Sequence, residues 1–333
     1  DLHLVSRTEP QIRLDGVLKP VNLPKLTGED IEEMAYSLIT EKQKQHFEEH
    51  DELDFALLLP GIGRFRANYY RTLGDTAAAF RIIPIEVPSL DDLGAPEVYK
   101  KLIKREKGLI LVTGPTGSGK STTLAAMLNE INLHEQKHIV TVEDPVEFIH
   151  ENKKCVFSHR GVGEDTSSFA VALKYAMRQD PDIILIGEMR DKETIEAALT
   201  AAETGHLVFG TLHTSSAPGT INRIIDVFTG DEQPQIRAMI SSSLVAVIAQ
   251  ALLPKLGGGR VAASEILVTN HAISNLIRED KVHQIYSQMQ LGQEGTGMQT
   301  QTQALLKFLR DGKISRDIAL QYANKPSELQ GKI

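Results

Sequence analysis

Glycines, a lysine and hydroxyl side chains lie together between positions 114 and 122. The segment GPTGSGKST follows the apolar run GLILVT and precedes the helical pattern TLAAML. Because Gly114, Gly117 and Gly119 lack side chains, successive backbone N–H groups can turn inward around phosphate oxygens. The helix that begins after them adds the positive end of its dipole. The sequence therefore predicts a phosphate-binding loop between a strand and a helix.

Two side chains of this loop suit nucleotide chemistry. Lys120 supplies a positive charge for the β- and γ-phosphates, and the Ser121 hydroxyl is a ligand for Mg²⁺. We therefore expect ATP and Mg²⁺ as cofactors. A glycine-rich turn without a ligand is the alternative, and the strand–loop–helix context argues against it. The residues expected to contact the nucleotide are Gly114, Pro115, Thr116, Gly117, Ser118, Gly119, Lys120, Ser121 and Thr122.

Acidic residues follow two other apolar runs. Glu188 comes directly after DIILIG, and Glu143 and Asp144 end the run HIVTVED. The carboxyl ends of strands face the ligand crevice in nucleotide-binding sheets. Either carboxylate can there hold the Mg²⁺ hydration shell or orient an attacking water. Acids on an ordinary surface loop are the alternative interpretation.

Two histidines bracket the apolar run LVFGTL. Residues seven apart on one strand lie more than about 20 Å from each other, so His206 and His213 cannot share a metal ion. His213 is expected where that strand emerges near the γ-phosphate, to which it can hydrogen-bond. Purely structural partners for both rings are the alternative.

Composition limits the classes of protein. The chain has 333 residues, a formal net charge of -8, 5% aromatic residues and no Trp, a balance that argues against a nucleic-acid channel. The single cysteine, Cys155, cannot build a disulfide framework or a multi-cysteine zinc site. The longest apolar stretch, 244–253, is about half the ~20 residues of a membrane span, and no secretory leader is visible at Asp1. We expect a soluble, cytoplasmic protein of two domains.

The predicted division into two domains follows from a change in the pattern of apolar runs and helical segments along the chain. Residues 1–93 combine β-rich alternating runs with helical segments that begin near Thr27 and Glu41, which predicts a small α+β domain. In residues 94–333, short apolar runs alternate with helical patterns, which predicts an α/β domain with a mainly parallel sheet covered on both faces. From QIRAMISSSLVAVIAQALLP onward we expect mostly helix, interrupted by GGGRVAASEILV as a hairpin or edge strand.

Four motifs together resemble those of the secretion ATPase superfamily. GPTGSGKS, TVEDPVEF, PDIILIGEMRD and AALTAAETGHLVFGTLHT look like its Walker A motif, Asp box, Walker B motif and His box. The opening DLHLVSRTEPQIRLDGVLKPV and the stretch NHAISNLIREDKVHQIYSQMQLGQEGTG are similar to the PilT family of pilus retraction ATPases. The resemblance covers nearly the whole chain. Within the family signature AIRNLIRE, Ser274 stands where an arginine is expected.

The resemblance implies a RecA-like ATPase domain behind a PAS-like N-terminal domain. It further implies a homohexameric motor, peripheral at the cytoplasmic face of the inner membrane, that drives type IV pilus retraction and twitching motility. The motor would act through an inner-membrane platform protein and indirectly on the pilin machinery, without zinc or nucleic acid.

The resemblance also assigns roles to single residues. Glu143 becomes the water-activating base, Glu188 joins the Mg²⁺ shell and His213 contacts the γ-phosphate. N-domain arginines, for which Arg64, Arg66 and Arg81 are the candidates, reach a nucleotide at a subunit or domain junction. Arg64 and Arg66 are two apart on a predicted strand and so share one face. A solvated strand face is the alternative for any one of them.

Several questions stay open at this point. Glu143 and Glu188 can exchange their roles. A related type II or type IV secretion ATPase shares these motifs. A nucleic-acid translocase with the same core is a further alternative, as is a ring that binds ATP without turning it over.

Overall fold

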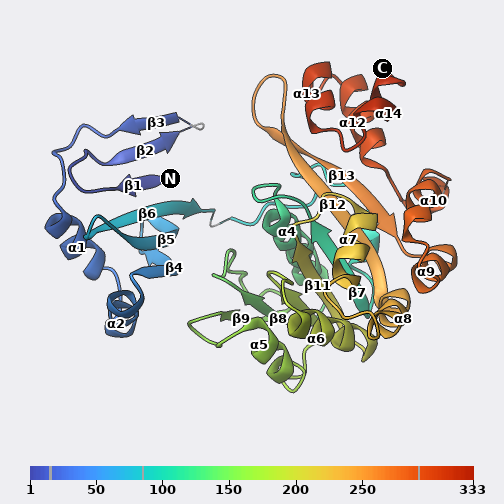
Figure 1. Ribbon diagram of the computed structural model, residues 1–333, viewed down its shortest axis with the longest axis horizontal. Helices are drawn as coiled ribbons and strands as arrows, with labels where there is room; N and C mark the ends of the chain where they lie inside the picture. The colour runs from blue at the N-terminus through green and yellow to red at the C-terminus, as the bar shows by residue number, and fades with distance from the viewer. Residues whose placement is uncertain (15–16, 85, 292) are drawn as a thin grey trace. The chain divides into compact units, whose positions relative to one another are not determined.

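The computed structural model describes residues 1–14, 17–84, 86–291 and 293–333. By its internal contacts the chain divides into unit 1, residues 1–86 and 145–149, and unit 2, residues 87–144 and 150–333 (Figure 1). The sequence predicts a division after residue 93 instead. Residues 87–93 pack with unit 2 because Leu90 is buried in its core.

Unit 1 is an antiparallel sheet with two helices. The strand order is β3-β2-β1-β6-β5-β4. Ala67 and Tyr69 of the fifth strand face the helices, and the Tyr69 hydroxyl donates to Ala35 O at 3.1 Å. The elements are β1 (Leu2–Leu4), β2 (Gln11–Leu14), β3 (Val17–Pro20), α1 (Gly28–Tyr36), α2 (Glu41–His50), β4 (Glu52–Leu59), β5 (Gly63–Thr72) and β6 (Asp75–Ile83). The predicted small α+β domain is confirmed.

Both helices of unit 1 begin at capping boxes. The Thr27 hydroxyl accepts from the N–H of Asp30, whose carboxylate accepts from the N–H of Thr27. Thr40 and Gln43 repeat the arrangement at α2. Such reciprocal bonds satisfy N–H groups that the first helical turn leaves without partners, which is why the helices begin where the sequence predicts.

Unit 2 is built on a seven-stranded sheet in the order β13-β12-β7-β11-β10-β8-β9. Every neighbouring pair is parallel except β12 and β13. The strands are β7 (Gly108–Thr113), β8 (His138–Glu143), β9 (Val156–Gly161), β10 (Ile183–Ile186), β11 (Leu207–Leu212), β12 (Leu244–Pro254) and β13 (Arg260–Val268). The mainly parallel sheet is confirmed.

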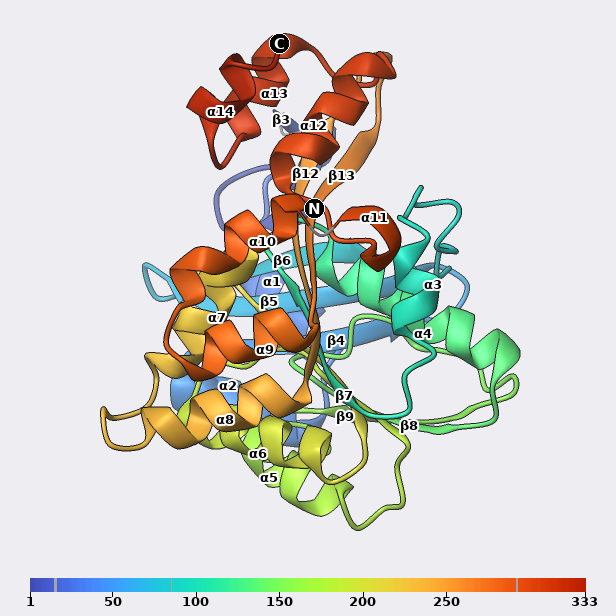
Figure 2. The same ribbon diagram turned by 90° about the vertical axis from the view of Figure 1, so that its right-hand side faces the viewer.

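Helices cover both faces of this sheet, so its strands are apolar throughout rather than alternating. Leu109 and Leu111 of β7 face one core, which contains the helices from α6 to α9, whereas Ile110 and Val112 face the other, which contains α3 and α4 (Figure 2). The helices are α3 (Val98–Leu102), α4 (Lys120–His134), α5 (Phe169–Ala176), α6 (Lys192–Glu203), α7 (Ala217–Ile225), α8 (Gln233–Ser243) and α9 (His271–Arg278).

The last part of the chain is helical. The 3₁₀ helix η1 (Val282–Gln284) is followed by α10 (Ile285–Leu291), α11 (Gln293–Thr296), α12 (Gln301–Arg310), α13 (Arg316–Tyr322) and α14 (Pro326–Gln330). Leu305, Ala319 and Leu329 of the last three helices form one cluster with Leu253 and Ala263 of the β12–β13 hairpin. The end of this hairpin is therefore the base on which the C-terminal helices pack (Figure 2).

One sequence expectation about this region is wrong. The run LVAVIAQALLP, predicted as helix, is strand β12, paired with β7 on one side and β13 on the other. A strand that is buried on both faces is apolar at every position and shows no alternation. Its sequence therefore cannot be distinguished from that of a buried helix by periodicity. The predicted hairpin at GGGRVAASEILV is confirmed, and β13 is an edge strand.

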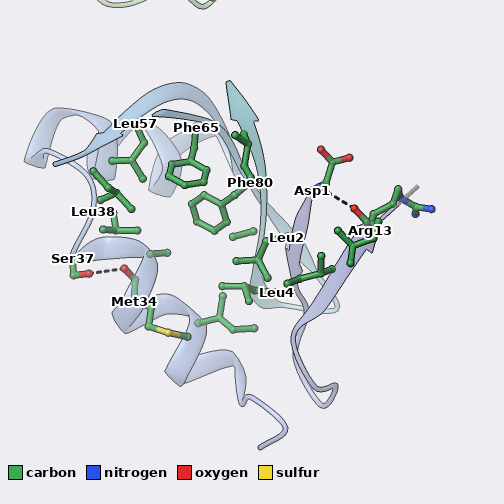
Figure 3. A pocket seen from close by; sticks show the side chains of 17 residues that line it. Asp1, Leu2, Leu4, Arg13, Met34, Ser37, Leu38, Leu57, Phe65 and Phe80 are labelled. Atoms are coloured by element: carbon green, nitrogen blue, oxygen red, sulfur yellow. Dashed lines mark hydrogen bonds between the residues drawn. The ribbon is translucent and has the colours of Figure 1, made fainter. Parts of the chain in front are cut away.

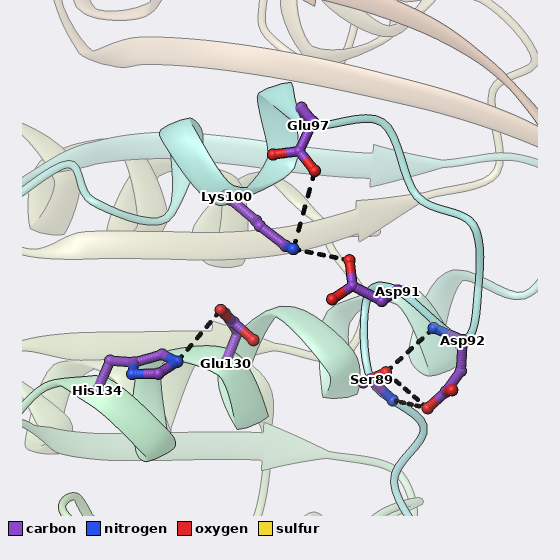
Figure 4. A network of polar contacts seen from close by, with 7 residues as sticks. All are labelled: Ser89, Asp91, Asp92, Glu97, Lys100, Glu130 and His134. Carbon is purple, nitrogen blue, oxygen red and sulfur yellow. Dashed lines mark hydrogen bonds and ion pairs between the residues drawn. The ribbon is translucent and has the colours of Figure 1, made fainter.

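Polar contacts organise the segment that leads into unit 2 (Figure 4). The Ser89 hydroxyl donates to the Asp92 carboxylate at 2.6 Å, and Lys100 of α3 pairs with Asp91 at 2.7 Å. Exposed pairs of this kind contribute about 0–1 kcal/mol each. The burial of Leu90 between them is therefore the main reason that this segment folds with unit 2.

Candidate active site

Four predicted site groups lie on four adjacent strands. The phosphate-binding loop follows β7, His213 follows β11, Glu188 follows β10 and Glu143 ends β8. In the sheet these strands are consecutive, in the order β7-β11-β10-β8, and all are parallel. Their carboxyl ends therefore share one edge, and at ~4.8 Å per strand the four groups span about 15 Å.

The phosphate-binding loop has the backbone conformation that its glycines permit. Gly114, Gly117 and Gly119 have φ values of 142°, 79° and 87°, which side-chain-bearing residues rarely adopt. Gly119 is the N-cap of α4, and no side chain in the described parts of the chain caps that helix. The first N–H groups of α4 are thus open to an anion.

Lys120 and Ser121 begin helix α4. The Lys120 ammonium donates to Gly114 O at 2.9 Å and to Pro115 O at 3.2 Å, so its side chain folds back across the loop. Ser121 is half-buried at the next position. The lysine charge and the serine hydroxyl therefore lie at the same end of α4 as its open N–H groups.

Gln250 of β12 forms hydrogen bonds with the phosphate-binding loop and the start of α4. The predictions from the sequence do not include this residue. Its Nε2 donates to Ser118 O at 2.7 Å, and its Oε1 accepts from the Thr123 hydroxyl at 3.1 Å. The side chain is 3% exposed. The available signal was a lone amide inside the apolar run LVAVIAQALLP.

Glu188 forms the centre of a charged cluster with His213 and Arg190. Its Oε1 lies 2.9 Å from His213 Nε2 and also accepts from Arg190 Nε. Burial raises the pKa of this carboxyl, but the hydrogen bond and charge of Arg190, together with His213, outweigh burial and lower it. The structure thus brings Glu188 and His213 together and keeps the carboxylate ionised.

A pocket of about 340 Å³ opens beside this cluster. Besides Glu188, Arg190 and His213, it is lined by Thr214 and by Arg223 of α7. Arg223 is a second cation there that sequence reasoning did not single out. Its helical surroundings in TINRII carry no signal of a site.

Glu143 is 9% exposed and lies next to the Walker B strand. The N–H of Gly187 donates to Val142 O at 2.8 Å, and a Cβ on Gly187 would lie 3.1 Å from the Cα of Glu143. Because Gly187 has no side chain, strands β8 and β10 can approach each other closely where Glu143 and Glu188 lie. Glu143 and Glu188 therefore lie at the ends of neighbouring strands, an adjacency that the sequence did not predict.

The three predicted arginines of unit 1 have different surroundings. Arg64 is 8% exposed and donates to Val146 O at 2.5 Å and to Glu147 O at 2.8 Å. Arg66 pairs with Asp54 at 2.6 Å, and Arg81 pairs with Asp1 at 2.9 Å. Arg66 and Arg81 lie directly opposite each other in the β5–β6 ladder. The two positive charges would repel, and each is paired with a separate carboxylate.

The fold and this edge define a class of protein: a P-loop ATPase with a RecA-like domain, in which a phosphate-binding loop, acidic strand ends and a histidine converge. In the described residues, no group of three or more His, Cys, Asp and Glu side chains could hold a metal ion. In those same residues, no helix has both the length and the apolar character that crossing a membrane requires.

The chain belongs to the type II/IV secretion system protein family, whose sequence profile matches residues 64–258. It is 52% identical to the type IV pilus retraction ATPase PilT of Pseudomonas aeruginosa, over 98% of this chain and 94% of that protein. It is 49% identical to a twitching motility protein of Neisseria gonorrhoeae, over 96% of this chain and 86% of that protein. A crystal structure of the pilus retraction motor PilT with bound ADP superimposes with a TM-score of 0.92 and 49% identity, covering 99% of this chain and 94% of that one.

Proposed function

We propose that this ATPase is a homohexameric motor that drives type IV pilus retraction, and hence twitching motility. It would work on the cytoplasmic side of the inner membrane and transmit force through a platform protein to the pilin machinery. The observation that carries this proposal is the sheet edge where the phosphate-binding loop, His213, Glu188 and Glu143 lie at the carboxyl ends of four consecutive parallel strands. Similarity to pilus retraction proteins along almost the whole chain supports the proposed role in pilus retraction.

The residues present fit ATP and Mg²⁺. The N-terminus of α4 has no side-chain cap, and the Ser118 hydroxyl is buried without a hydrogen-bond partner among the described residues. Lys120 would hold the β- and γ-phosphates, while Ser121 and Glu188 would hold Mg²⁺, the latter through water. The bound ion would supply positive charge that stabilises the phosphates during transfer.

Proton transfer falls to Glu143 in this proposal. Glu188 is ionised and already engaged by Arg190 and His213, which suits a carboxylate that holds a hydrated cation. Glu143 is nearly buried on the adjacent strand, where water is scarce, which suits a base that orients one attacking water. His213, linked to Glu188 at 2.9 Å, would respond to the γ-phosphate and its loss.

Cations from unit 1 complete the proposed mechanism. A positive charge on the transferring phosphoryl group contributes ~10³–10⁵ in rate in related phosphoryl transfers. We propose that Arg66 and Arg81, whose carboxylate partners are solvent-accessible, exchange these partners for phosphate oxygens at a junction. Arg64 is the third candidate, although its two carbonyl partners are buried or half-buried.

The test is phosphate release by the purified protein, wild type beside Glu188→Gln, with the assembly state measured in the same sample. The variant keeps the size of the side chain but removes its charge, so we expect at least a hundredfold loss of turnover with hexamer formation unchanged. Glu232→Gln, a substitution of a half-buried acid paired with Lys192, is the matched control and should leave turnover within twofold of wild type.

Each outcome bears on a different part of the proposal. Turnover that rises with hexamer formation supports junctional sites with arginines in trans. Turnover by a monomer would contradict that arrangement. ATP binding without turnover in any assembly state would favour a nucleotide-gated ring.

The biological role needs a separate test, because secretion ATPases share the catalytic motifs. A strain that lacks its own copy of this gene should lose twitching and keep surface pili. The wild-type gene should restore twitching, and the Glu188→Gln gene should not. Retained twitching together with a block in protein export would instead assign the chain to a secretion system.

A further inference from the structure

The phosphate-binding loop is held by a contact from a strand that no motif includes. Gln250 of β12 lies where this strand continues beyond its last partner on β7, since Ala249 is in register with Thr113. Its side chain therefore projects into the space under the loop. Both ends of its amide are bonded, to Ser118 O at 2.7 Å and to the Thr123 hydroxyl at 3.1 Å.

The orientation of this amide is determined by its partners. A carbonyl oxygen can only accept a hydrogen bond, so Nε2 must face Ser118 O. Oε1 then faces Thr123, whose hydroxyl can donate. A flipped amide would place two acceptors against each other at 2.7 Å, which makes the observed orientation the stable one.

We infer that Gln250 is a positioning residue for the phosphate-binding loop, and this inference rests on the proposed nucleotide site. The peptide between Ser118 and Gly119 is planar and trans, so the Gly119 N–H points away from the side of Ser118 O. By drawing that carbonyl toward β12, Gln250 turns the Gly119 N–H toward the interior of the loop. Without this bond the peptide would rotate easily, because glycine at 119 opposes rotation weakly.

The glycines of the loop are adapted to the same residue. A Cβ on Gly114 would lie 2.2 Å from Gln250 O, and a Cβ on Gly119 would lie 3.2 Å from Gln250 Nε2. Both Gly114 and Gly119 therefore permit backbone turns and also the close approach of β12. The phosphate-binding loop and β12 therefore pack against each other, and Ser118 O accepts from the Gln250 amide instead of from water.

The experiment compares Gln250→Met with Thr123→Val in the full chain. The first variant keeps an unbranched side chain of similar length and removes both hydrogen bonds. The second removes only the bond to Oε1 and leaves the bond to Ser118 O in place. The probe is ADP with Mg²⁺, titrated calorimetrically, together with the ATP dependence of phosphate release.

We expect Gln250→Met to raise the Kd for ADP and the KM for ATP by about tenfold, with kcat within twofold of wild type. Thr123→Val should change the Kd by less than threefold. A purely structural role would lower the thermal stability of both variants but leave the Kd of the folded protein unchanged. A Kd for Gln250→Met within twofold of wild type would overturn the inference.

Two further variants keep the test decisive. If Gln250→Met does not fold, Gln250→Asn replaces it, because its amide is one methylene too short to reach Ser118 O. Lys120→Ala reports on the nucleotide site itself. Wild-type ADP binding by Lys120→Ala would contradict the proposed site, whereas lost binding there with wild-type binding by Gln250→Met would contradict this inference alone.

Discussion

At the scale of single residues, the charges around Glu188 decide how the carboxylate behaves. Burial alone would raise its pKa, and Arg190 and His213 lower it instead. A lowered carboxyl pKa means that the ionised form is retained as the pH falls. Arg190 is largely exposed, so it can be replaced with little effect on packing.

We therefore predict that Arg190→Gln raises the pKa of Glu188. If the ionised carboxylate is required for turnover, the acid limb of the profile of kcat/KM against pH should move to higher pH by about half a unit or more. Arg178→Gln, at an exposed arginine elsewhere on unit 2, is the control. An acid limb that coincides with that of wild type would show that Glu188 does not control it.

His150 provides a residue-scale prediction about stability. Burial, aided by the nearby His159 and Lys153 charges, lowers its pKa from 6.5 to about 4. Its ring stacks on Phe157, with centroids 4.6 Å apart. The unfolded chain therefore takes up a proton at this side chain at a higher pH than the folded chain does. Stability should fall as the pH drops from about 6.5 to about 4.

The loss expected from His150 over this range is about 3 kcal/mol in the free energy of unfolding. His150→Phe keeps a stacking ring and removes the titration, so its unfolding free energy should decline less between pH 7 and pH 4. Urea titrations at several pH values measure the difference, with His134→Phe at an exposed position as the control. Parallel declines in wild type and His150→Phe would contradict the assignment.

At the scale of elements, one buried carboxylate joins two helices. Glu265 of β13 is 2% exposed and accepts from the N–H of Ala217 at 2.8 Å and from the N–H of Gln301. These are the first residues of α7 and α12. Helix α7 follows the loop that carries His213, and Asn324 donates to Ser215 O of that loop at 2.8 Å. The C-terminal helices are thus fastened to the His213 loop at two points.

We predict that Glu265→Ala lowers the free energy of unfolding by about 2–4 kcal/mol, because it leaves two buried helix N–H groups without an acceptor. Glu265→Gln keeps an acceptor oxygen and should cost less than half as much. Burial raises the pKa of Glu265, so wild-type stability should also decline as the pH rises above 4.5, a component that Glu265→Gln lacks. Equal losses for Ala and Gln would show that the carboxylate charge, which both variants lack, sets the cost rather than the presence of an acceptor oxygen.

At the scale of the whole molecule, the two units are interleaved in sequence. The chain leaves unit 2 after Asp144, contributes residues 145–149 to unit 1, and returns at His150. Val146 and Phe148 of this segment are buried, and Arg64 binds the carbonyls of Val146 and Glu147. The segment begins two residues after Glu143, so in the sequence it lies close to a proposed catalytic acid.

Arg64→Met should release this segment. A buried guanidinium bonded to two carbonyls contributes more than an exposed pair, so we expect unit 1 to lose about 2–3 kcal/mol and amide exchange to accelerate across residues 145–149. Arg66→Met removes a partly exposed pair with Asp54 and should cost about 1 kcal/mol or less. Exchange measured by mass spectrometry distinguishes the two, and unchanged exchange in 145–149 for Arg64→Met would contradict the role.

Much of the architecture could be predicted from local signals. The strand–loop–helix around Lys120 was evident because each part has its own chemistry: apolar residues in the strand, glycines at positive φ and a helical pattern behind them. Glu143, Glu188 and His213 are predicted as site residues because they end or follow apolar runs. In contrast, the sequence predicts helix at 244–254, where the structure has strand β12, since a strand buried on both faces has no alternation that marks it.

The sequence by itself therefore determined the family motifs, the candidate reactive side chains and the predicted phosphate-binding loop. Only the tertiary structure decided that β7, β11, β10 and β8 are neighbours, that Gln250 orients Ser118 O, and that residues 145–149 join unit 1. The physical reason is the separation along the sequence between the groups that interact. Capping, turn chemistry and apolar runs act over a few residues, whereas strand order and the partner of a buried carbonyl depend on groups separated by more than a hundred positions.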